Sequence, residues 1–397
     1  MDRPAPFPPS RTKRGVRARP LAAGTYLRRN AGKTLPLIGV IVLAVMLVAG
    51  IIAMINSIPY SIRTIYGYSR EMTGVTPRGD ATQTKPILDE IQKHSPVPVG
   101  RVVTCRATMT QIRSIVGKWP FYVLGLSKPD MEYYLDRQKV TGIVGRLPID
   151  GKPEAIVSEP LARNLDLKIG SELLGPDKDE SGFSPYSVKV VGIAQTDRWL
   201  AAVPVGYLRE NHFPPVDLGM VFAKDSSQQD RLDRWTDKRF KGRRAAVLAY
   251  FQIEKNTQDM FKTLFLILDV IIGVMVLVMT TIMGMLINIY QTQRLQEFGL
   301  LAAIGYTKKQ ILRRVATESV MVVVLGWLLG LLLAYGLLLV AKATMMDPRA
   351  YAIDPLDPLA YSYTVPIPIA ILIVAIGTVI HRFRNLDPIG IVERRLV

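Results

Sequence analysis

The sequence predicts an α-helical membrane protein with four transmembrane helices and a mixed α+β extracytoplasmic domain inserted between the first and second helices. Three observations lead to this fold class. Four apolar blocks approach or exceed the roughly 20 residues that a helix needs to cross a bilayer core of about 30 Å. A polar stretch long enough for a complete domain separates the first two blocks. Lys and Arg residues gather at alternate ends of the blocks.

The four apolar blocks differ in length and in charge. The second block contains one charged residue, Asp269, and the other three contain none. The fourth block is short and begins with Pro366 and Pro368, which a first helical turn tolerates because the missing N–H has no partner there. The blocks are Leu35–Ile55, Leu264–Ile289, Val320–Ala341 and Val365–Ile380.

The distribution of basic residues predicts the orientation in an inner (plasma) membrane. Residues 1–34 carry nine Lys and Arg residues against one acid, and the segment 290–319 and the tail from His381 are also rich in bases. Both termini and the middle loop are therefore expected in the cytoplasm, with the large domain outside. The net charge of +17 is read as a topology and anionic-lipid signal, because the basic tail lacks the interleaved aromatic residues of a nucleic-acid surface.

These observations divide the chain into nine segments. We expect a basic cytoplasmic tail (1–34), helix 1 (35–58), an extracytoplasmic domain with helical stalks (59–259), helix 2 (260–290), a cytoplasmic coupling helix and loop (291–318), helix 3 (319–341), a short outer loop (342–362), helix 4 (363–381) and a cytoplasmic tail (382–397).

Within the extracytoplasmic domain the residue patterns indicate alternating helices and strands. The helices are expected at Lys85–His94 and Glu159–Leu165, with stalks at Ile58–Tyr68 and Ile253–Lys262. The strands are expected at Val97–Cys105, Phe121–Leu126, Ala155–Ser158, Ser187–Ile193, Leu218–Ala223 and Arg244–Phe251, and a polar loop at Gly175–Ser184.

The cytoplasmic loop after the second block predicts a short amphipathic helix. Apolar residues at 295, 298, 301 or 302, and 304 fall on one side of it. Gly305 suits the left-handed position that ends a helix, and Thr307 with Gln310 forms a capping box that starts the next one. The apolar side needs a cover, which is either lipid headgroups or the groove of a cytoplasmic partner, and the spacing leaves both open.

The same loop resembles the signature of the FtsX-like, MacB-type ABC transporter permeases, R-x-x-E-[FI]-G-L-x-x-A-[IL]-G-[AY]-[ST]-x-x-[QD]-I followed by a Glu. The matching residues are Arg294, Glu297, Phe298, Gly299, Leu300, Ala303, Ile304, Gly305, Tyr306, Thr307, Gln310, Ile311 and Glu318. Two further stretches are similar to this family. Segments between Gly145 and Ile193 resemble the MacB-like periplasmic core domain, and Asp387-Pro388-Ile389 resembles the closing D-P motif.

The resemblance implies a permease that transmits force instead of forming a channel. A dimer of separate cytoplasmic ABC ATPase subunits would pull on the coupling helix, and two permease copies, identical or homologous, would carry the motion to the extracytoplasmic domain. It implies export or extraction of a substrate, with an adaptor of the membrane-fusion type as a further partner. The alternative is an FtsX-like regulator that drives a cell-wall hydrolase. The residues assigned to ATPase coupling are Arg294, Glu297, Phe298, Gly299, Leu301, Ala303, Gly305, Thr307 and Lys308.

The chain itself is not expected to be an enzyme or to hold a cofactor. Gly32-Lys33-Thr34 ends like a phosphate-binding loop, but position 27 is Leu where the motif requires Gly. Three His residues and one Cys, widely spaced, give no metal-ligand cluster. Asp269 is the one candidate intramembrane polar site. It lies five residues into its block, which favours a structural residue in contact with water near the outer interface.

Overall fold

The computed structural model describes residues 31–384 except 116, 179–181, 212–216, 241 and 243–244. The basic N-terminal tail before Ala31 and the Asp387-Pro388-Ile389 motif lie outside the described residues. The chain divides into two compact units. One, the helical unit, contains residues up to Ala49, Ile271–Ala334 and those from Tyr361. The other, the sheet unit, contains Gly50–Val270 and Tyr335–Ala360.

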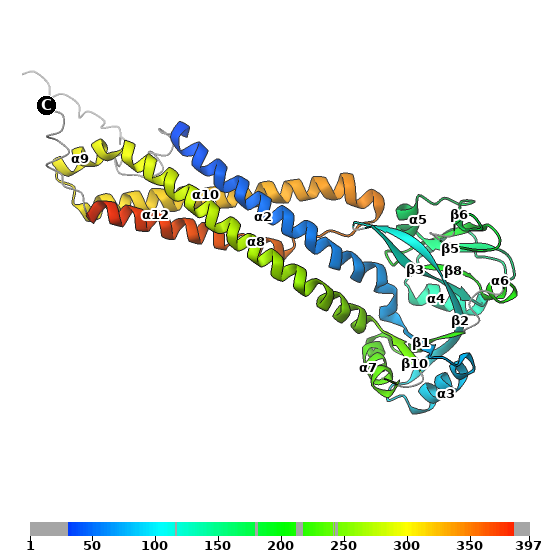
Figure 1. The fold of residues 1–397 in the computed structure, drawn as a ribbon. Coiled ribbons are helices and arrows are strands. Elements are labelled where there is room, and N and C mark those ends of the chain that lie inside the picture. The colour runs from blue at the N-terminus through cyan, green and yellow to red at the C-terminus, as the bar shows by residue number, and fades with distance from the viewer. Residues whose placement is uncertain are drawn as a thin grey trace, which may run out of the picture. The chain divides into compact units, whose positions relative to one another are not determined.

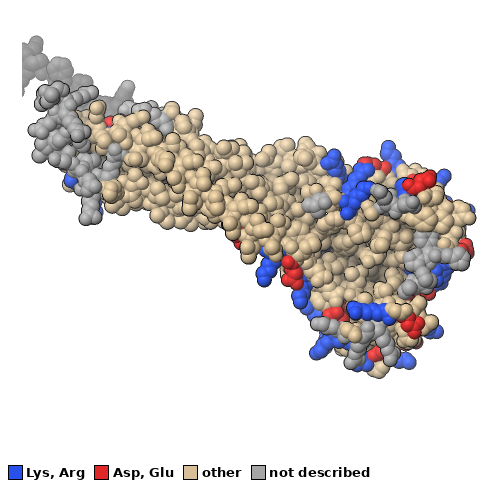
Figure 2. Space-filling model, viewed as in Figure 1, with Lys and Arg blue, Asp and Glu red and all other residues tan. Residues whose placement is uncertain are grey.

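Four helices are long and apolar enough to cross a membrane, and each contains one predicted block. They are α2 (Ala31–Ile65), α8 (Tyr250–Gln293), α10 (Lys308–Ala341) and α12 (Pro366–Arg384). Their most apolar windows have mean hydropathies of 3.1, 2.7, 2.5 and 2.3 in that order. Helix α12 starts at Pro366, one residue after the start of the predicted block at Val365. Figure 2 shows a nearly continuous surface of uncharged side chains along the helices, with Lys, Arg, Asp and Glu gathered over the sheet domain.

Within the helical unit, α2 and α10 approach closely at two glycines one turn apart. A Cβ on Gly326 would lie 3.0 Å from Cβ of Ile41, and a Cβ on Gly330 would lie 2.8 Å from Cβ of Val45. The absence of side chains at these positions lets the two backbones come together, which is how helices pack in lipid without a hydrophobic driving force. Trp327 fixes the neighbouring side of α10, because its indole N–H donates to the hydroxyl of Thr364 at 3.1 Å.

The sheet unit is built on ten strands. Nine follow the order β10-β1-β9-β2-β3-β8-β5-β7-β4, and β6 pairs with β7. The strands are β1 (Thr73–Pro77), β2 (Val99–Ser114), β3 (Gly117–Leu126), β4 (Gly142–Gly145), β5 (Glu154–Ser158), β6 (Glu172–Leu174), β7 (Val188–Gln195), β8 (Ala201–Pro204), β9 (Leu218–Ala223) and β10 (Ala245–Leu248). The long strand β2 joins the two halves, because it pairs with β9 near its start and with β3 near its end.

Short helices cover this sheet and connect its strands. They are η1 (Tyr66–Glu71), η2 (Ala81–Gln83), α3 (Thr84–His94), α4 (Lys128–Arg137), α5 (Glu159–Leu165), α6 (Val205–Glu210), η3 (Ser226–Gln228) and α7 (Gln229–Phe240). Helices α3 and α7 lie beside β1, β9 and β10 and bury a core with members such as Val75, Ile91, Val221 and Leu232 (Figure 1). The larger core of the other half includes Phe121, Trp199 and Val203.

The outer segment after α10 belongs to the sheet unit and is bonded to it. It contains η4 (Lys342–Met346), η5 (Asp347–Arg349) and α11 (Pro358–Ser362). The amide of Asn164 donates to the carbonyl of Arg349 at 2.8 Å, and the amide of Asn56 donates to the carboxylate of Asp357 at 2.6 Å. This segment is therefore a structural part of the sheet unit.

Most predicted elements of the domain are present, but three predicted strands have other bounds. Strand β2 runs to Ser114 instead of ending at Cys105, and β3 begins at Gly117 instead of Phe121. Helices α3 and α5 and strand β9 match their predicted ranges within a residue, and both stalks are helical. The predicted strand Arg244–Phe251 was wrong at its C-terminal end. Strand β10 ends at Leu248, and Tyr250 already begins α8, because an apolar run of this kind satisfies a strand and a buried helix start equally well. Strands β1, β4, β6 and β8 were not predicted.

Candidate functional site

The loop after α8 forms a short helix, α9 (Leu295–Ala303), between α8 and α10. Its C-terminal end is closed by two backbone hydrogen bonds. The N–H of Gly305 donates to the carbonyl of Ala302 at 3.0 Å, and the N–H of Tyr306 donates to the carbonyl of Leu301 at 3.1 Å. Gly305 has φ +104°, a region that residues with a Cβ avoid. This is the Schellman arrangement that the sequence predicted at this glycine.

The start of α10 is fixed by the predicted capping box. The N–H of Thr307 donates to the side-chain oxygen of Gln310 at 2.9 Å, and the N–H of Gln310 donates to the Thr307 hydroxyl at 3.3 Å. Both bonds satisfy amide groups that have no partner inside the helix. Only Ile304, Gly305 and Tyr306 separate the end of α9 from this cap, so the turn between the two helices has a defined geometry.

Arg294, between α8 and α9, is the centre of a buried ion cluster. Its side chain is only 2% exposed, and its guanidinium donates to Glu318 of α10 at 2.7 Å and to Glu297 of α9 at 3.2 Å. Arg314 donates to the other oxygen of Glu318 at 3.0 Å. Charges can be buried only when they are paired and hydrogen-bonded in this way. The cluster therefore ties the ends of α8, α9 and α10 together.

The guanidinium of Arg294 is also enclosed by aromatic rings. It lies 5.3 Å from the ring centre of Tyr290 and 5.2 Å from that of Phe298. The apolar side of α9 packs beside it, where Phe298 joins Ile311 and Val315 of α10 and Val379 of α12 in one buried cluster. The apolar side of α9 around Phe298 is thus covered by the chain's own helices.

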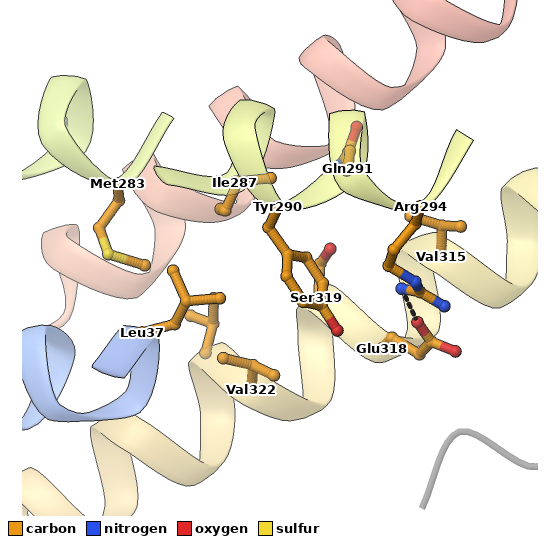
Figure 3. A pocket seen from close by; sticks show the side chains of 11 residues that line it. Leu37, Met283, Ile287, Tyr290, Gln291, Arg294, Val315, Glu318, Ser319 and Val322 are labelled. Atoms are coloured by element: carbon orange, nitrogen blue, oxygen red, sulfur yellow. Dashed lines mark hydrogen bonds and ion pairs between the residues drawn. The ribbon is translucent and has the colours of Figure 1, made fainter. Parts of the chain in front are cut away.

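A small cavity of 30 Å³ lies beside this cluster (Figure 3). Figure 3 shows Arg294 paired with Glu318 at one end and Leu37, Met283 and Val322 toward the other. Gln291 also lines it, and neither the oxygen nor the nitrogen of its buried amide has a hydrogen-bond partner among the described residues. A buried unpaired amide costs about 1–3 kcal/mol, so the junction is less well satisfied here than at the ion cluster.

The opposite side of α9 is exposed and combines acid and apolar groups. Leu300 is 65% exposed and Ile304 is 68% exposed, one helical turn apart, and the Glu297 side chain is 53% exposed. Ala303 lies on the same side. We call Gln296, Glu297, Leu300, Ala303 and Ile304 the outer face of α9. It is the part of the junction that another molecule can reach.

The predicted coupling residues separate into two groups. Glu297, Ala303, Gly305, Thr307 and Lys308 are exposed. Arg294, Phe298 and Gly299 are buried and Leu301 is half-buried, so these residues hold the helix in place. Leu300 and Ile304 were missing from the assigned residues, and Ile304 was placed on the apolar side that packs. A helical projection centred on Phe298 would have placed both on the opposite side of α9, since successive residues turn by 100°.

Asp269 lies apart from this junction, in the sheet unit. It is exposed on α8 and lines a cavity of 630 Å³ with residues of α2 that include Asn56 and Arg63. No group of three or more His, Cys, Asp or Glu side chains among the described residues is arranged to hold a metal ion.

Each of the two stalks is joined to the sheet domain at one end. In η1, which follows α2, the carbonyl of Gly67 accepts from Arg198 at 2.6 Å and the carbonyl of Tyr68 accepts from Gln138 at 3.0 Å. Helix α8 follows β10 with one residue, Ala249, between them. Arg70 donates to the hydroxyl of Tyr250 at 2.6 Å and so connects the end of one stalk to the start of the other.

These features define an integral membrane protein with a large inserted domain and a short, rigidly held helix between its second and third spans. Residues 270–388 match the model of the FtsX-like permease C-terminal family, a range that begins within α8 and includes α9, α10 and α12. The matched range includes the coupling loop, so the resemblance found there is confirmed for this part of the chain. No curated protein matches the sequence.

Three solved structures are similar to the sheet domain. The periplasmic region of MacB from Actinobacillus actinomycetemcomitans is 11% identical with a TM-score of 0.29, covering 49% of this chain and 95% of that one. The extracellular domain of the noncanonic ABC-type transporter YknZ from Gram-positive bacteria is 17% identical with a TM-score of 0.26, covering 44% of this chain and 97% of that one. A domain of a putative permease from Porphyromonas gingivalis is 13% identical with a TM-score of 0.22, covering 45% of this chain and 88% of that one. At these scores the likeness says nothing about substrate or partners.

Proposed function

We propose that the chain is the transmembrane permease subunit of an ABC transporter and transmits ATP-driven motion from a separate cytoplasmic ATPase to its extracytoplasmic domain, to export or extract a substrate. The outer face of α9 is the observation that carries this proposal. Leu300 and Ile304 expose large apolar side chains next to the carboxylate of Glu297, although the other side of the helix is packed and ion-paired. An amphipathic helix with one face free is suited to lie in the groove of a partner.

The rigidity of the junction supports a force-bearing role. Arg294 connects α9 to α10 through buried charge-assisted bonds, and the Schellman and capping-box bonds fix the turn that follows. A displacement of α9 therefore has to move α8 and α10 with it, since no flexible loop separates the three helices. The ATP-driven closure of an ATPase dimer would supply that displacement.

The length and continuity of α8 provide the transmission path. It runs without interruption over 44 residues, from Tyr250 beside β10 to Gln293 beside α9. At 1.5 Å per residue this is about 66 Å of helix, twice the thickness of a bilayer core. The bonds from Arg198 and Gln138 to η1 attach the other stalk to the sheet domain, so neither stalk ends in a loose linker.

The remaining partners follow from the same proposal. An ATPase dimer presents two grooves, so two permease copies, identical or homologous, are required. In this proposal both termini and α9 lie in the cytoplasm and the sheet domain lies outside, and the distribution of basic residues supports this orientation. An adaptor of the membrane-fusion type would meet the sheet domain.

The proposal is tested by purifying the tagged full chain from its native host in detergent and measuring ATPase activity in the preparation. We expect an ABC-type ATPase, identified by mass spectrometry, to co-purify. A single cysteine introduced as Ala303→Cys should cross-link to that subunit with a short bifunctional maleimide. The background is low because the native thiol, Cys105, is buried and burial raises its pKa to about 12.

Charge substitutions on the outer face provide the decisive comparison. Leu300→Glu and Ile304→Glu should remove the ATPase and the cross-link while the purified chain keeps its melting temperature, since both side chains are exposed and neither belongs to the ion cluster. Ile169→Glu, which replaces an apolar side chain 51% exposed on the sheet domain, is the matched control and should leave both signals unchanged. An ATPase retained at wild-type level by Leu300→Glu and Ile304→Glu would overturn the proposal.

A further inference from the structure

A polar hollow of 310 Å³ lies where the two stalks meet the sheet domain. Its charged lining residues are Arg63 of α2, Arg70 of η1, Asp197 and Arg198 between β7 and β8, and Glu254 of α8. All of them belong to the sheet unit, so the hollow is formed within one compact body. We call this hollow the stalk cleft.

Two arginines of the stalk cleft have no carboxylate partner. Arg63 donates to the carbonyl of Pro59 in its own helix at 3.3 Å, and Arg70 donates to the hydroxyl of Tyr250 at 2.6 Å. Both acceptors are uncharged, and within the part of the chain that the structure describes neither arginine forms an ion pair. Each guanidinium therefore keeps N–H donors and a full positive charge for another group in the cleft.

Arg198 adds a third positive charge and is held in place by the chain. Its guanidinium donates to the carbonyl of Gly67 at 2.6 Å and lies 3.8 Å from the carboxylate of Glu71, which is too long for a hydrogen bond. Asp197 and Glu254 are the two carboxylates of the lining, and neither is paired with any of the three arginines. The excess of positive charge favours an anion.

The stalk cleft continues into the cavity of 630 Å³ beside Asp269, because Arg63 and Glu254 line both. The apolar lining residues of this second cavity include Phe261, Phe265 and Leu266. Residues 270–293 of α8 contain no charge, so the second cavity lies at the end of the apolar part of the helix. An anion in the stalk cleft that carried an apolar body would find a place for that body here.

The charges of the second cavity determine which end of such a molecule enters which hollow. Its lining adds two carboxylates, Asp259 and Asp269, and one ammonium group, Lys262, to the two shared residues. Acidic groups are therefore in excess there, and this part repels an anion. The anionic end belongs among the arginines and the uncharged end beside the phenylalanines.

We propose that the stalk cleft binds the phosphate group of an amphiphile whose apolar body lies in the second cavity. A planar guanidinium forms two parallel bonds to a phosphate, and a phosphate has enough acceptor oxygens for more than one arginine. The phosphate is supplied either by a membrane lipid or by a soluble phosphate ester, and the test separates these sources. Placing the cleft outside the membrane rests on the proposed function, but the test contains no ATPase and no nucleotide, so the two can fail separately.

The test uses the full chain in an uncharged maltoside detergent, in which no other phosphate competes. The probe is phosphatidic acid with a photoreactive diazirine at the start of one acyl chain. After irradiation, proteolysis and mass spectrometry, we expect stronger labelling of 261–266 than of 271–282, which lies in the apolar part of the same helix. Labelling of 261–266 that does not exceed that of 271–282 would overturn the proposal.

Three unlabelled competitors identify the group that is recognised. Phosphatidic acid should displace the label from 261–266, and diacylglycerol, which has the same apolar body without the phosphate, should not. Displacement by glycerol 3-phosphate assigns the cleft to soluble phosphate esters, and persistence of the label assigns it to lipids. Equal displacement by diacylglycerol and phosphatidic acid would overturn the proposal, because the phosphate would then contribute nothing.

Substitution of Arg63 tests the positive charge. Arg63→Gln should lower labelling of 261–266 by about tenfold, as expected for the loss of one hydrogen bond to a charged group. The fold should persist, since the bond to Pro59 lies within one helix. Arg63→Lys keeps the charge and should retain part of the labelling. Arg78→Gln, which removes an exposed arginine outside both hollows, is the control and should change nothing.

Substitution of Glu254 tests the same electrostatics in the opposite direction. Glu254→Gln removes a negative charge from the residues that both hollows share, and should raise labelling of 261–266 by about threefold because the phosphate is no longer repelled. A misfolded variant would lose labelling, so a gain cannot come from misfolding. Labelling at the wild-type level in both Arg63→Gln and Glu254→Gln would contradict the assignment.

Discussion

Arg294 and Glu318 form a hydrogen-bonded ion pair at 2.7 Å, both almost fully buried, although 24 residues separate them in the chain. The pair joins the end of α8 to α10 at the point where the exposed face of α9 begins. The free energy of the Arg294–Glu318 pair therefore determines how firmly α9 is held against α8 and α10. A buried pair stabilises little against apolar replacements, but breaking it by removing one partner is costly, and this difference is measurable.

The first prediction concerns this pair. Arg294→Met leaves the Glu318 carboxylate buried without its closest cation and should destabilise the chain by about 3–5 kcal/mol. Adding Glu318→Gln removes the stranded charge, while an amide oxygen remains to accept from Arg314. The double variant should thus melt at a higher temperature than Arg294→Met alone in the same detergent. Equal melting temperatures for the two variants would contradict the ion-pair account.

A second prediction tests the contact between α2 and α10. Gly330→Leu places a side chain where a Cβ alone would lie 2.8 Å from Val45, so the helices must separate at a cost of about 1–3 kcal/mol. Gly336→Leu is the matched control on the same helix, because a Cβ at that position would meet no atom within 4 Å. Melting in detergent should fall for Gly330→Leu only. A similar fall in both variants would assign the effect to the apolar side chain itself.

The third prediction isolates the left-handed residue after α9. Gly305 has open space around it, so the penalty of Gly305→Ala comes from its φ of +104° and should be about 1 kcal/mol. Amide hydrogen exchange in the last turn of α9 should accelerate, because the Schellman bonds weaken. Gly377→Ala in α12, also in open space but with ordinary helical φ, should not accelerate exchange there. Unchanged exchange in Gly305→Ala would show that the bond pattern does not depend on glycine.

The fourth prediction concerns pH. Burial raises the pKa of Asp233 in α7 from 3.8 to about 7, while hydrogen bonds from Thr73 and Gln229 act in the opposite direction. Between about pH 4 and 7 the folded chain holds a proton that the unfolded chain has released. The contribution of Asp233 to the free energy of unfolding is therefore fully present below pH 4. It is lost as the pH rises through 7, which lowers the free energy of unfolding by up to about 4 kcal/mol.

Asp233→Asn provides the measurement, because an amide oxygen can accept from the same two donors without ionising. The melting temperature of Asp233→Asn minus that of the wild type should increase as the pH is raised from 5 to 8. Asp237→Asn is a control for the same substitution on the same helix, since the Asp237 side chain is only half-buried. A constant difference between Asp233→Asn and wild type across this range would show that Asp233 does not titrate there.

Local patterns carried most of the prediction from sequence. The four spans, the Gly305 turn, the capping box at Thr307 and the helix Lys85–His94 each depend on residues within one or two helical turns, so their signals are contained in a short window. The strand predicted at Arg244–Phe251 failed at its end because apolar residues alone do not distinguish β10 from the start of α8.

Features that depend on distant residues were not predictable in this way. Strand β1 is recognisable only through its pairing with β9 and β10, which lie more than a hundred residues later. The burial of Arg294 was also hidden, since a charged residue at the end of a transmembrane helix is usually exposed, and its partner Glu318 was known only as a motif residue. The outward position of Ile304 is different, because a helical projection centred on Phe298 gives it from the loop sequence alone.

Only one residue, Ala249, separates β10 from α8, so no flexible linker joins this helix to the sheet. Ala249 is fully buried, and β10 is hydrogen-bonded along its length to β1. Under the proposed function, a displacement of α8 along or about its axis would therefore act directly on β10 and change its position relative to β1.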